Sequence, residues 1–378
     1  MSIYTTPLQI GYFFSILMWM LFLIRGYREQ RLSDRLLGWI MFLLAMELQD
    51  YTFGFAGINV LWNELNGFPR GVQLLFGPIV YFYFRVQVNR KFRLGPKHLW
   101  HFLPYTVAFL YEFVGFVQGP EGVQRLQAST HYLVLSYVNR VLMVISYGYY
   151  LSRCIVIYKK YRIWSLQQFS NNDLISFRWF RNFIYAMIFW LVFREVMNVL
   201  DLLLDLDFYQ DWWWNLALVA VALYVGLAGY EQQQPAKIRF EEVENLSKVN
   251  QLTSELTSSK SEIEQDKAEV AERLNALMKE DKLFIQADLS LHELARHLQV
   301  NASVLSATIN QVFGQNFNDF INTLRIEEFV RMYKEDTANR FTLLSLALDS
   351  GFNSKATFNR AFKKIKGNSP RDFLQDLK

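Results

Sequence analysis

The first 230 residues contain seven apolar stretches, each close to the length of a membrane-spanning helix. A bilayer core about 30 Å thick requires roughly 20 apolar residues, because a helix advances by about 1.5 Å per residue. An α-helix also satisfies its backbone hydrogen bonds internally, as a segment in hydrocarbon must. The pattern therefore predicts a bundle of seven transmembrane helices, at residues 7–24, 36–58, 71–88, 99–117, 131–157, 183–204 and 212–230.

The charges between these stretches predict an orientation. Loops after the first, third and fifth spans hold thirteen Lys and Arg residues, whereas loops after the second, fourth and sixth hold only Arg70 and Arg125. Short cytoplasmic loops are enriched in Lys and Arg, so the N-terminus is expected outside and the chain after residue 230 in the cytoplasm. A cleaved signal peptide is a competing interpretation of the first stretch, but the basic residues follow that stretch instead of preceding it.

Composition separates a membrane part from a polar part. The first 235 residues carry 33 charged side chains and the last 143 carry 41, although the whole chain is 52% apolar. The single cysteine, Cys154, excludes a disulfide framework and a cysteine-based zinc site. We find no glycine-rich phosphate loop, no metal-spaced His and Glu cluster and no nucleophile elbow, so the sequence predicts neither an enzyme nor a cofactor.

Several ionisable residues interrupt the predicted spans. A charge at bilayer depth costs roughly 2.5 to 3.5 kcal/mol on insertion scales, so such residues are expected to face one another inside the bundle. Two interpretations stay open: a polar pocket for a small-molecule or peptide signal, or structural ion pairs that fix helix register. The residues concerned are Glu47, Asp50, Arg140, Arg194 and Glu195.

Residues 236–283 form a polar, net acidic segment with a seven-residue repeat of apolar positions. The repeat consists of Val249, Leu256, Ile263, Val270 and Leu277, with Leu246 and Leu274 three positions before two of them. A coiled coil needs a second apolar position in each heptad, but this position is occupied by Thr253, Lys260 and Lys267. These polar residues weaken a coiled coil. The pattern predicts a helical linker, either a weak parallel homodimer through residues 243–277 or a single solvated helix.

The last 95 residues contain one structural unit twice, because residues 291–320 align with residues 343–373 when one residue is inserted. In the first copy, Ser290 and Glu293 have the spacing of a capping box, and Asn301 is expected to cap a second helix. The spacing predicts that Leu305, Ile309 and Val312 of this helix face inward. In the second copy, Gly351 is expected to make the turn and Asn353 to cap, with Phe358, Phe362 and Ile365 buried. Each copy is a predicted helix-turn-helix, whose second helix suits the DNA major groove.

Outward positions of the two second helices are candidates for contacts with double-stranded DNA. Arg, Lys and Asn read base edges or bind phosphates, and Lys364 adds phosphate-neutralising charge. A solvated helix face or a protein-docking module is the alternative. The candidates are Ser303, Ser306 and Asn310 in the first copy, and Lys355, Asn359, Arg360 and Lys363 in the second.

Residues 347–373, ALDSGFNSKATFNRAFKKIKGNSPRDF, resemble the signature of the AraC/XylS class of transcription regulators. The segment 289–326 resembles the first unit of that class and the long helix that joins its two units. The resemblance implies recognition helices near 302–312 and 354–364 in successive major grooves about 34 Å apart. It also adds Gln311 and Ser354 to the candidate contacts. The first recognition helix has no Lys or Arg, so affinity is expected to depend on the second unit and on dimerisation.

The motifs FGPIVYFYFR and HFLPY resemble the membrane halves of bacterial regulators that fuse a seven-helix domain to this module. The prediction is an all-α protein of the bacterial cytoplasmic membrane. It comprises a transmembrane sensor (1–235), a helical linker (236–283) and a domain of two helix-turn-helix units (284–378) that binds DNA and regulates transcription. The rivals are a transporter or channel with a regulatory tail, and a regulator released by proteolysis within 236–262.

Overall fold

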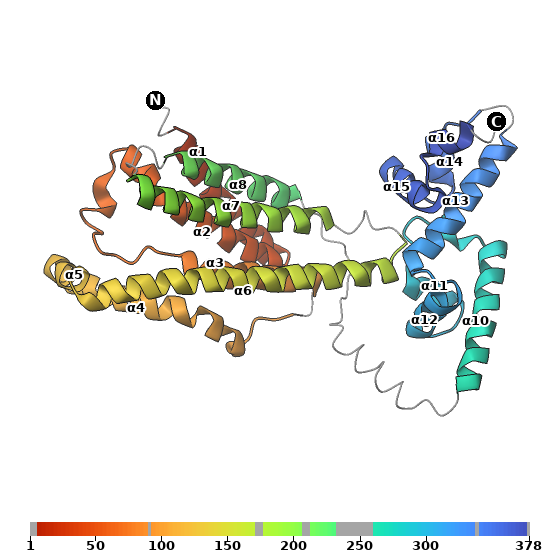
Figure 1. Cartoon of the computed structure of the whole chain (residues 1–378), viewed down its shortest axis with the longest axis horizontal. Helices are drawn as coiled ribbons and strands as arrows, with labels where there is room; N and C mark the ends of the chain where they lie inside the picture. Colours follow the sequence, from red (N-terminus) through yellow and green to blue (C-terminus); the bar gives the residue numbers. More distant parts are fainter. Residues whose placement is uncertain are drawn as a thin grey trace. The chain divides into compact units, whose positions relative to one another are not determined.

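The computed structural model is all-helical in the part of the chain that it describes, residues 6–89, 92–170, 177–205, 212–231, 260–336 and 340–375 (Figure 1). The chain divides into two compact units. One consists of residues 1–159 with 178–239, and the other of residues 160–177 with 240–378. The seam positions Leu246, Val249 and Leu256, and the loop residues Arg90 and Lys91, lie outside the described residues.

A helix covers most of each of the seven predicted apolar stretches. These helices are α1 (Thr6–Arg28), α2 (Leu32–Phe55), α3 (Gln73–Val88), α4 (Leu103–Val117), α6 (Thr130–Gln168), α7 (Phe177–Leu204) and α8 (Trp212–Glu231). Shorter helices lie between them: η1 (Asn59–Leu61), η2 (Pro96–Phe102) and α5 (Gly119–Gln127). The predicted all-helical fold is therefore confirmed for the described residues.

Within the described residues, four helical segments are long and apolar enough to cross a membrane: Thr6–Arg28, Thr130–Gln168, Trp179–Asp201 and Trp214–Glu231. Helices α3 and α4 contain 16 and 15 residues, which corresponds to only about 24 Å and 22 Å. Large apolar side chains on α4, α6 and α7 point outward, among them Val114, Ile145 and Val192 with more than half of their surface exposed. Such side chains are stable in lipid and costly in water.

The predicted cytoplasmic ends of α1, α2 and α8 are joined by one arginine. The Arg25 guanidinium lies 2.7 Å from an Asp34 carboxylate oxygen and donates to the Tyr230 carbonyl over 2.8 Å. Elsewhere in this unit the Trp179 indole N–H donates to the Tyr83 hydroxyl over 2.8 Å, which connects α7 to α3. Polar contacts therefore fix the register of helices whose surfaces are otherwise apolar.

The second unit contains two hydrophobic cores. Its helices are α10 (Lys260–Glu280), η3 (Leu283–Ile285), α11 (Leu291–His297), α12 (Ala302–Val312), α13 (Phe317–Glu335), α14 (Leu343–Asp349), α15 (Lys355–Lys366) and α16 (Pro370–Gln375). The first core joins α10, α11, α12 and the start of α13, and the second joins the rest of α13 to α14, α15 and α16. Helix α13 is therefore shared: Ile321 is buried in the first core and Phe329 in the second.

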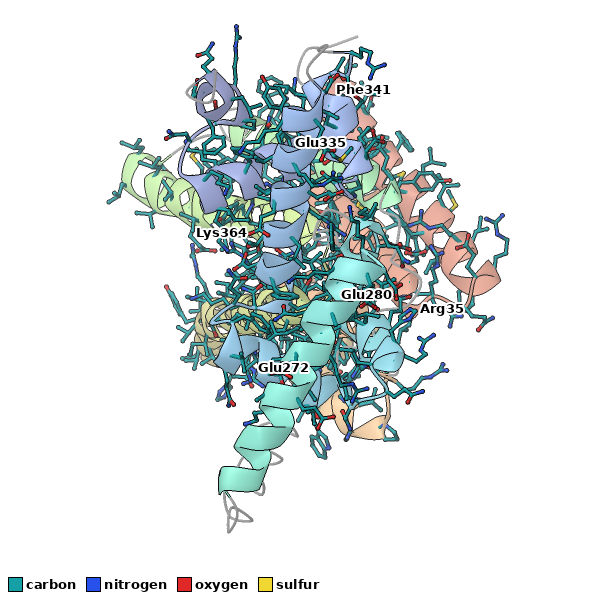
Figure 2. All side chains as sticks on the ribbon, turned by 90° about the vertical axis from the view of Figure 1, so that its right-hand side faces the viewer. Arg35, Glu272, Glu280, Glu335, Phe341 and Lys364 are labelled. Atoms are coloured by element: carbon teal, nitrogen blue, oxygen red, sulfur yellow. The ribbon has the colours of Figure 1, made fainter. Side chains whose placement is uncertain are left out.

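The C-terminal half of α10 belongs to the first core. Val270, Leu274 and Met278 are buried there, while Glu272 and Glu280 are exposed (Figure 2). The packed domain thus begins inside α10 and not at the predicted boundary of residue 284. Because Val270 and Leu274 are two of the predicted seam positions, packing inside the chain removes them from a dimer seam. The side chain of Ile263 lies outside the described residues.

A glycine at the predicted second turn contacts the segment before α11. Gly351 has a φ of +99°, and a Cβ there would lie 2.7 Å from the carbonyl oxygens of Phe284 and Ile285. We expect Gly351→Ala to lower the free energy of unfolding by about 2 kcal/mol, because backbone oxygens cannot rotate away and the φ is strained. Pulse proteolysis of membranes containing the full chain, across a urea series, measures this loss.

Gly367 provides the matched control. Its φ is +84°, but no heavy atom lies within 4 Å of the position that a Cβ would occupy. Gly367→Ala therefore carries only the backbone cost of about 1 kcal/mol. Equal losses for the two variants would show that the contact of Gly351 with residues 284–285 does not matter.

Candidate nucleic-acid interface

N-capping hydrogen bonds define the start of both helices in the first helix-turn-helix. The backbone N–H of Glu293 donates to the Ser290 hydroxyl, and the backbone N–H of Ser290 donates to the Glu293 carboxylate over 2.9 Å. The side chain of Asn301 accepts the backbone N–H of Ser303 over 3.0 Å and caps α12. Both predicted caps are confirmed. Together they fix where α11 and α12 begin, and thus the angle at which α12 leaves the turn.

In the second helix-turn-helix one predicted cap is wrong. Ser354, and not Asn353, is the N-cap of α15, and its hydroxyl accepts the backbone N–H of Thr357 over 3.2 Å. Asn353 is exposed. The difference arises because Ser and Asn are equally good caps, so two adjacent capping residues do not determine the first residue of the helix. Phe358 and Phe362 are buried as predicted.

The ten candidate DNA contacts lie on the outward sides of α12 and α15. Ser306 and Ser354 are half-buried, and the other eight are exposed: Ser303, Asn310, Gln311, Lys355, Asn359, Arg360, Lys363 and Lys364. Helix α15 carries five basic residues and no acidic one, whereas α12 carries no charge. The structure therefore provides one basic recognition helix and one neutral one.

Several of these side chains already have partners within the domain. The Ser303 hydroxyl donates to Asn301 over 2.9 Å, and Gln311 accepts from Lys267 over 2.7 Å. Lys364 lies 2.6 Å from an Asp319 carboxylate oxygen at the start of α13 (Figure 2). In contrast, Lys355 and Lys363 take part in none of the ion pairs found in the described residues. These two cations are thus the most available to phosphates.

One buried position on α12 was predicted wrongly. Val312 was expected to face inward, but about half of its surface is exposed. The helix ends at this residue, and Phe313 turns into the core in its place, with its ring 4.8 Å from that of Phe320. Val304 is also 40% exposed, so apolar groups that can contact thymine methyls lie beside the polar candidates on this helix.

A cluster of charges holds α13 to the end of α10. Glu328 lies 2.9 Å from the Lys282 ammonium and 2.7 Å from the Arg331 guanidinium. The hydrogen bond from Arg331, followed by the contacts with Lys282, lowers the pKa of Glu328 from 4.5 to about 2. A carboxyl whose pKa is lower when folded stabilises the fold above its unfolded pKa and loses this contribution as the pH falls.

We therefore expect Glu328→Gln to lower the free energy of unfolding by about 1–2 kcal/mol at pH 7, a value reduced because Arg331 is half exposed to water. The difference from the unmodified protein should shrink as the pH falls below about 4.5 and disappear near pH 2. Pulse proteolysis in urea at pH 7 and pH 3 measures it. A difference of the same size at both pH values would contradict this assignment.

The structure brings together only part of the charged cluster predicted inside the spans. Arg194 lies 3.3 Å from Glu47 and 3.7 Å from Glu195. Asp50 instead pairs with Arg70 over 3.5 Å, and Arg140 is exposed and makes none of the ion pairs among the described residues. The predicted five-residue cluster is thus reduced to three, because sequence position does not fix which way an all-round apolar helix is rotated.

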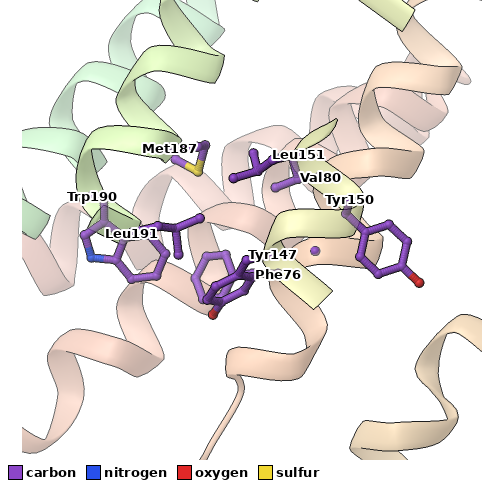
Figure 3. A pocket seen from close by; sticks show the side chains of 9 residues that line it. Phe76, Val80, Tyr147, Tyr150, Leu151, Met187, Trp190 and Leu191 are labelled. Atoms are coloured by element: carbon purple, nitrogen blue, oxygen red, sulfur yellow. The ribbon is translucent and has the colours of Figure 1, made fainter. Parts of the chain in front are cut away.

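Two cavities lie close to this cluster. A small one of about 20 Å³ is enclosed by side chains of α3, α6 and α7, including Phe76, Tyr147 and Trp190 (Figure 3). A larger cavity of about 570 Å³ lies between α6 and α7 and is open to the outer surface of these helices, where Val192 and Val196 are exposed. Glu195 is its one acidic lining residue. Tyr147 lines both cavities. The unit of residues 1–159 and 178–239 therefore contains an apolar space with a carboxylate at its wall.

Comparison with known proteins concerns the C-terminal part alone. The family described as "Helix-turn-helix domain" matches residues 294–376. Over 106 residues the chain is 33% identical to an uncharacterized HTH-type transcriptional regulator of Staphylococcus aureus strain COL, and to a similar protein of strain N315. Over 85 residues it is 29% identical to the melibiose operon regulatory protein of Escherichia coli K12.

These matches cover 28% and 22% of this chain, and 14% and 27% of the relatives. No solved structure matches the chain. The matched region begins inside α11 and contains α12, α14 and α15, with all ten candidate contacts. The C-terminal part of this chain therefore carries a helix-turn-helix domain of the AraC type, similar to those of HTH-type transcriptional regulators.

Proposed function

We propose that this protein is a membrane-anchored transcription regulator that binds specific DNA sites through α12 and α15. The observation that carries the proposal is the pair of capped helix-turn-helix units with an exposed basic face on α15. Lys355, Arg360 and Lys363 supply phosphate and guanine contacts, and Asn310 and Asn359 suit adenine. The relatives named above, called transcriptional regulators, support the same function.

Genome-wide mapping of the DNA bound by the full chain tests this function. The protein should carry one tag at each end, and the DNA recovered with each tag should be mapped separately. We expect both tags to recover the same discrete sites. Recovery with the C-terminal tag alone would show that the DNA-binding domain acts after proteolytic release, and the absence of discrete sites would refute the function.

The apolar helices support anchoring in the bacterial cytoplasmic membrane with the C-terminus inside the cell. In the part of the chain that the structure describes, four segments have the length and composition of membrane spans, and the loop charges alternate as described above. Fusing the C-terminus to reporters that are active on only one side of the membrane tests this orientation. A reporter active outside the cytoplasm would place the DNA-binding domain away from DNA and would refute the proposal.

We further propose that the Arg194–Glu47–Glu195 cluster and the cavity between α6 and α7 receive a signal. A ligand shifts an equilibrium between two states only if it binds one of them more tightly. Arg194 is placed to couple ligand binding to such an equilibrium, because it contacts both carboxylates and also donates to the Met143 sulfur over 2.9 Å. The cavity would admit an apolar or amphipathic molecule.

We expect Arg194→Gln to abolish the change in expression of bound genes between growth conditions, while the amount of protein in membranes and its DNA sites stay as in the unmodified protein. Replacing the guanidinium leaves Glu47 without its cation and removes the coupling between helices. Comparing transcripts of the mapped genes under several conditions measures this. Loss of the protein from membranes would instead show that the cluster is structural, and Arg70→Gln, which breaks the Asp50 pair, is the matched control.

A further inference from the structure

The DNA-binding unit contains a segment that does not belong to the C-terminal part of the chain. Residues 160–168 are the last turns of the long helix α6, and residues 169 and 170 follow it. All of them come after the fifth predicted span, yet they form one compact unit with residues 240–378. Phe169 pairs with Ser290 in an antiparallel bridge, and the backbone N–H of Ser170 donates to the Leu289 carbonyl over 3.2 Å. Residues 165–170, the docking segment, thus bind the backbone at the start of the first helix-turn-helix.

Two residues of α13 bind the docking segment from the other side. The Asn318 amide donates to the carbonyls of Ser170 and Phe169 over 2.8 and 3.2 Å. Arg325 donates to the Ser170 hydroxyl over 3.2 Å and to the carbonyls of Phe284 and Gln286 over 2.6 and 2.7 Å. Ser170 has no exposed surface, and Arg325 only 1%. The docking segment is therefore held by directed, buried hydrogen bonds.

Arg325 makes the site sensitive to the position of the segment. Its guanidinium takes part in no ion pair among the described residues, and carbonyl and hydroxyl oxygens alone receive its N–H groups. Burial lowers its pKa to about 10, so the group stays charged near neutral pH. A buried charge that loses an acceptor is costly, so withdrawal of Ser170 would favour rearrangement around Arg325.

The same two residues lead to the second recognition helix. Asn318 precedes Asp319, whose carboxylate pairs with Lys364 of α15. The Arg325 guanidinium lies 5.8 Å from the centre of the Phe352 ring, in the turn before α15. The two α13 residues that bind the docking segment are thus one residue or one ring away from Lys364 of α15 and from Phe352 of the turn before it.

We propose that the docking segment is the input surface of the DNA-binding domain: when bound to Asn318 and Arg325 it fixes the placement of α15 relative to α12. The partner that binds the α13 surface is therefore a segment of the same chain. This inference rests on the proposed DNA-binding function. The bound state is the one suited to DNA, because Asn310, Lys355 and Lys363 are all exposed while the segment is docked.

Cross-linking in the full chain tests the contact itself. Opposed residues of an antiparallel pair have Cα atoms about 4.5–5.5 Å apart, within the range for a disulfide. The double variant Phe169→Cys, Ser290→Cys should be oxidised in isolated membranes and then cleaved at a protease site inserted between residues 240 and 250. We expect the two fragments to stay joined. A yield no higher than that of Phe169→Cys, Ser345→Cys, which places the second thiol on α14, would overturn the proposal.

Occupancy of DNA sites tests the consequence. Ser170→Ala and Asn318→Ala should each lower occupancy of the mapped sites by about five- to tenfold, the effect expected of one or two buried hydrogen bonds. Glu327→Ala, an exposed position on α13, should leave occupancy unchanged. Occupancy equal to that of the unmodified protein in both docking variants would overturn the proposal, even if the cross-link forms.

A spacing test separates positioning from loss of stability. Inserting one base pair between the two contacted grooves rotates them by about 34° relative to each other. The unmodified protein should lose at least tenfold in occupancy at such a site, whereas Ser170→Ala should lose less than threefold relative to its own intact site. Equal losses would show that the segment only stabilises the domain. If Arg360→Ala also bound DNA like the unmodified protein, the proposed DNA interface would be refuted. The cross-link would still show the contact of the docking segment, so the two failures can be distinguished.

Discussion

Replacing Arg360 and Lys363 together by alanine should lower occupancy of the mapped DNA sites by about a hundredfold. Both residues are exposed on α15, one turn apart, on the side opposite the buried Phe358 and Phe362. A good base or phosphate contact from Arg or Lys contributes about 1–3 kcal/mol, and each 1.4 kcal/mol is a factor of ten in affinity. Because α12 carries no charge, no cation of the first recognition helix can compensate for the loss.

The control removes the same amount of charge elsewhere in the domain. Lys279 on α10 and Lys334 on α13 are exposed, and their replacement by alanine tests whether net charge alone governs binding. We expect the control to change occupancy by less than threefold, and footprints of the Arg360, Lys363 variant to lose protection over one major groove. An equal loss in both double variants would mean that the basic face of α15 binds DNA without a defined register.

Local signals in the sequence predicted much of the DNA-binding domain. The capping box at Ser290 and the cap at Asn301 lie within three residues of the groups that they bind, so their geometry follows from spacing alone. Spacing also predicted the burial of Leu305 and Phe358. It was less informative at helix ends, where Val312 turned outward and Ser354 replaced Asn353 as cap.

The contacts of the docking segment could not be predicted in this way, because they join residues about 120 to 155 positions apart. One signal was present. Arg325 occupies the position between Ile321 and Phe329 on an apolar stripe of four-residue spacing, where a charge requires a buried partner. The sequence indicates that such a partner exists, but it does not indicate which oxygen atoms accept the hydrogen bonds of Arg325.

In the unit of residues 1–159 and 178–239 the sequence predicted that charged residues meet inside the helix bundle, but not all of their pairings. Glu47 and Arg194 meet, as opposite signs at similar depth suggested. Asp50 lies only three residues from Glu47 yet pairs with Arg70 in a loop, and Arg140 faces outward. The sequence of α6 does not show which face of the helix is buried, because apolar residues surround it. Packing against neighbouring helices decides how α6 is rotated.

Phe362→Ala should cause the largest loss of stability in the second core, about 3–5 kcal/mol in the free energy of unfolding. The Phe362 ring is fully buried, and its centroid lies 5.5 Å from that of Phe358, 5.4 Å from that of Phe373 and 5.9 Å from that of Phe329. Because α12 is packed in a separate core, α14 to α16 should become unprotected in hydrogen exchange while α11 and α12 keep most of their protection. Phe362→Leu, which retains most of the apolar volume, should cost about 1 kcal/mol. Equal loss of protection in both cores would show that the two helix-turn-helix units unfold as one, and that α13 transmits any disturbance of α15 directly to α12.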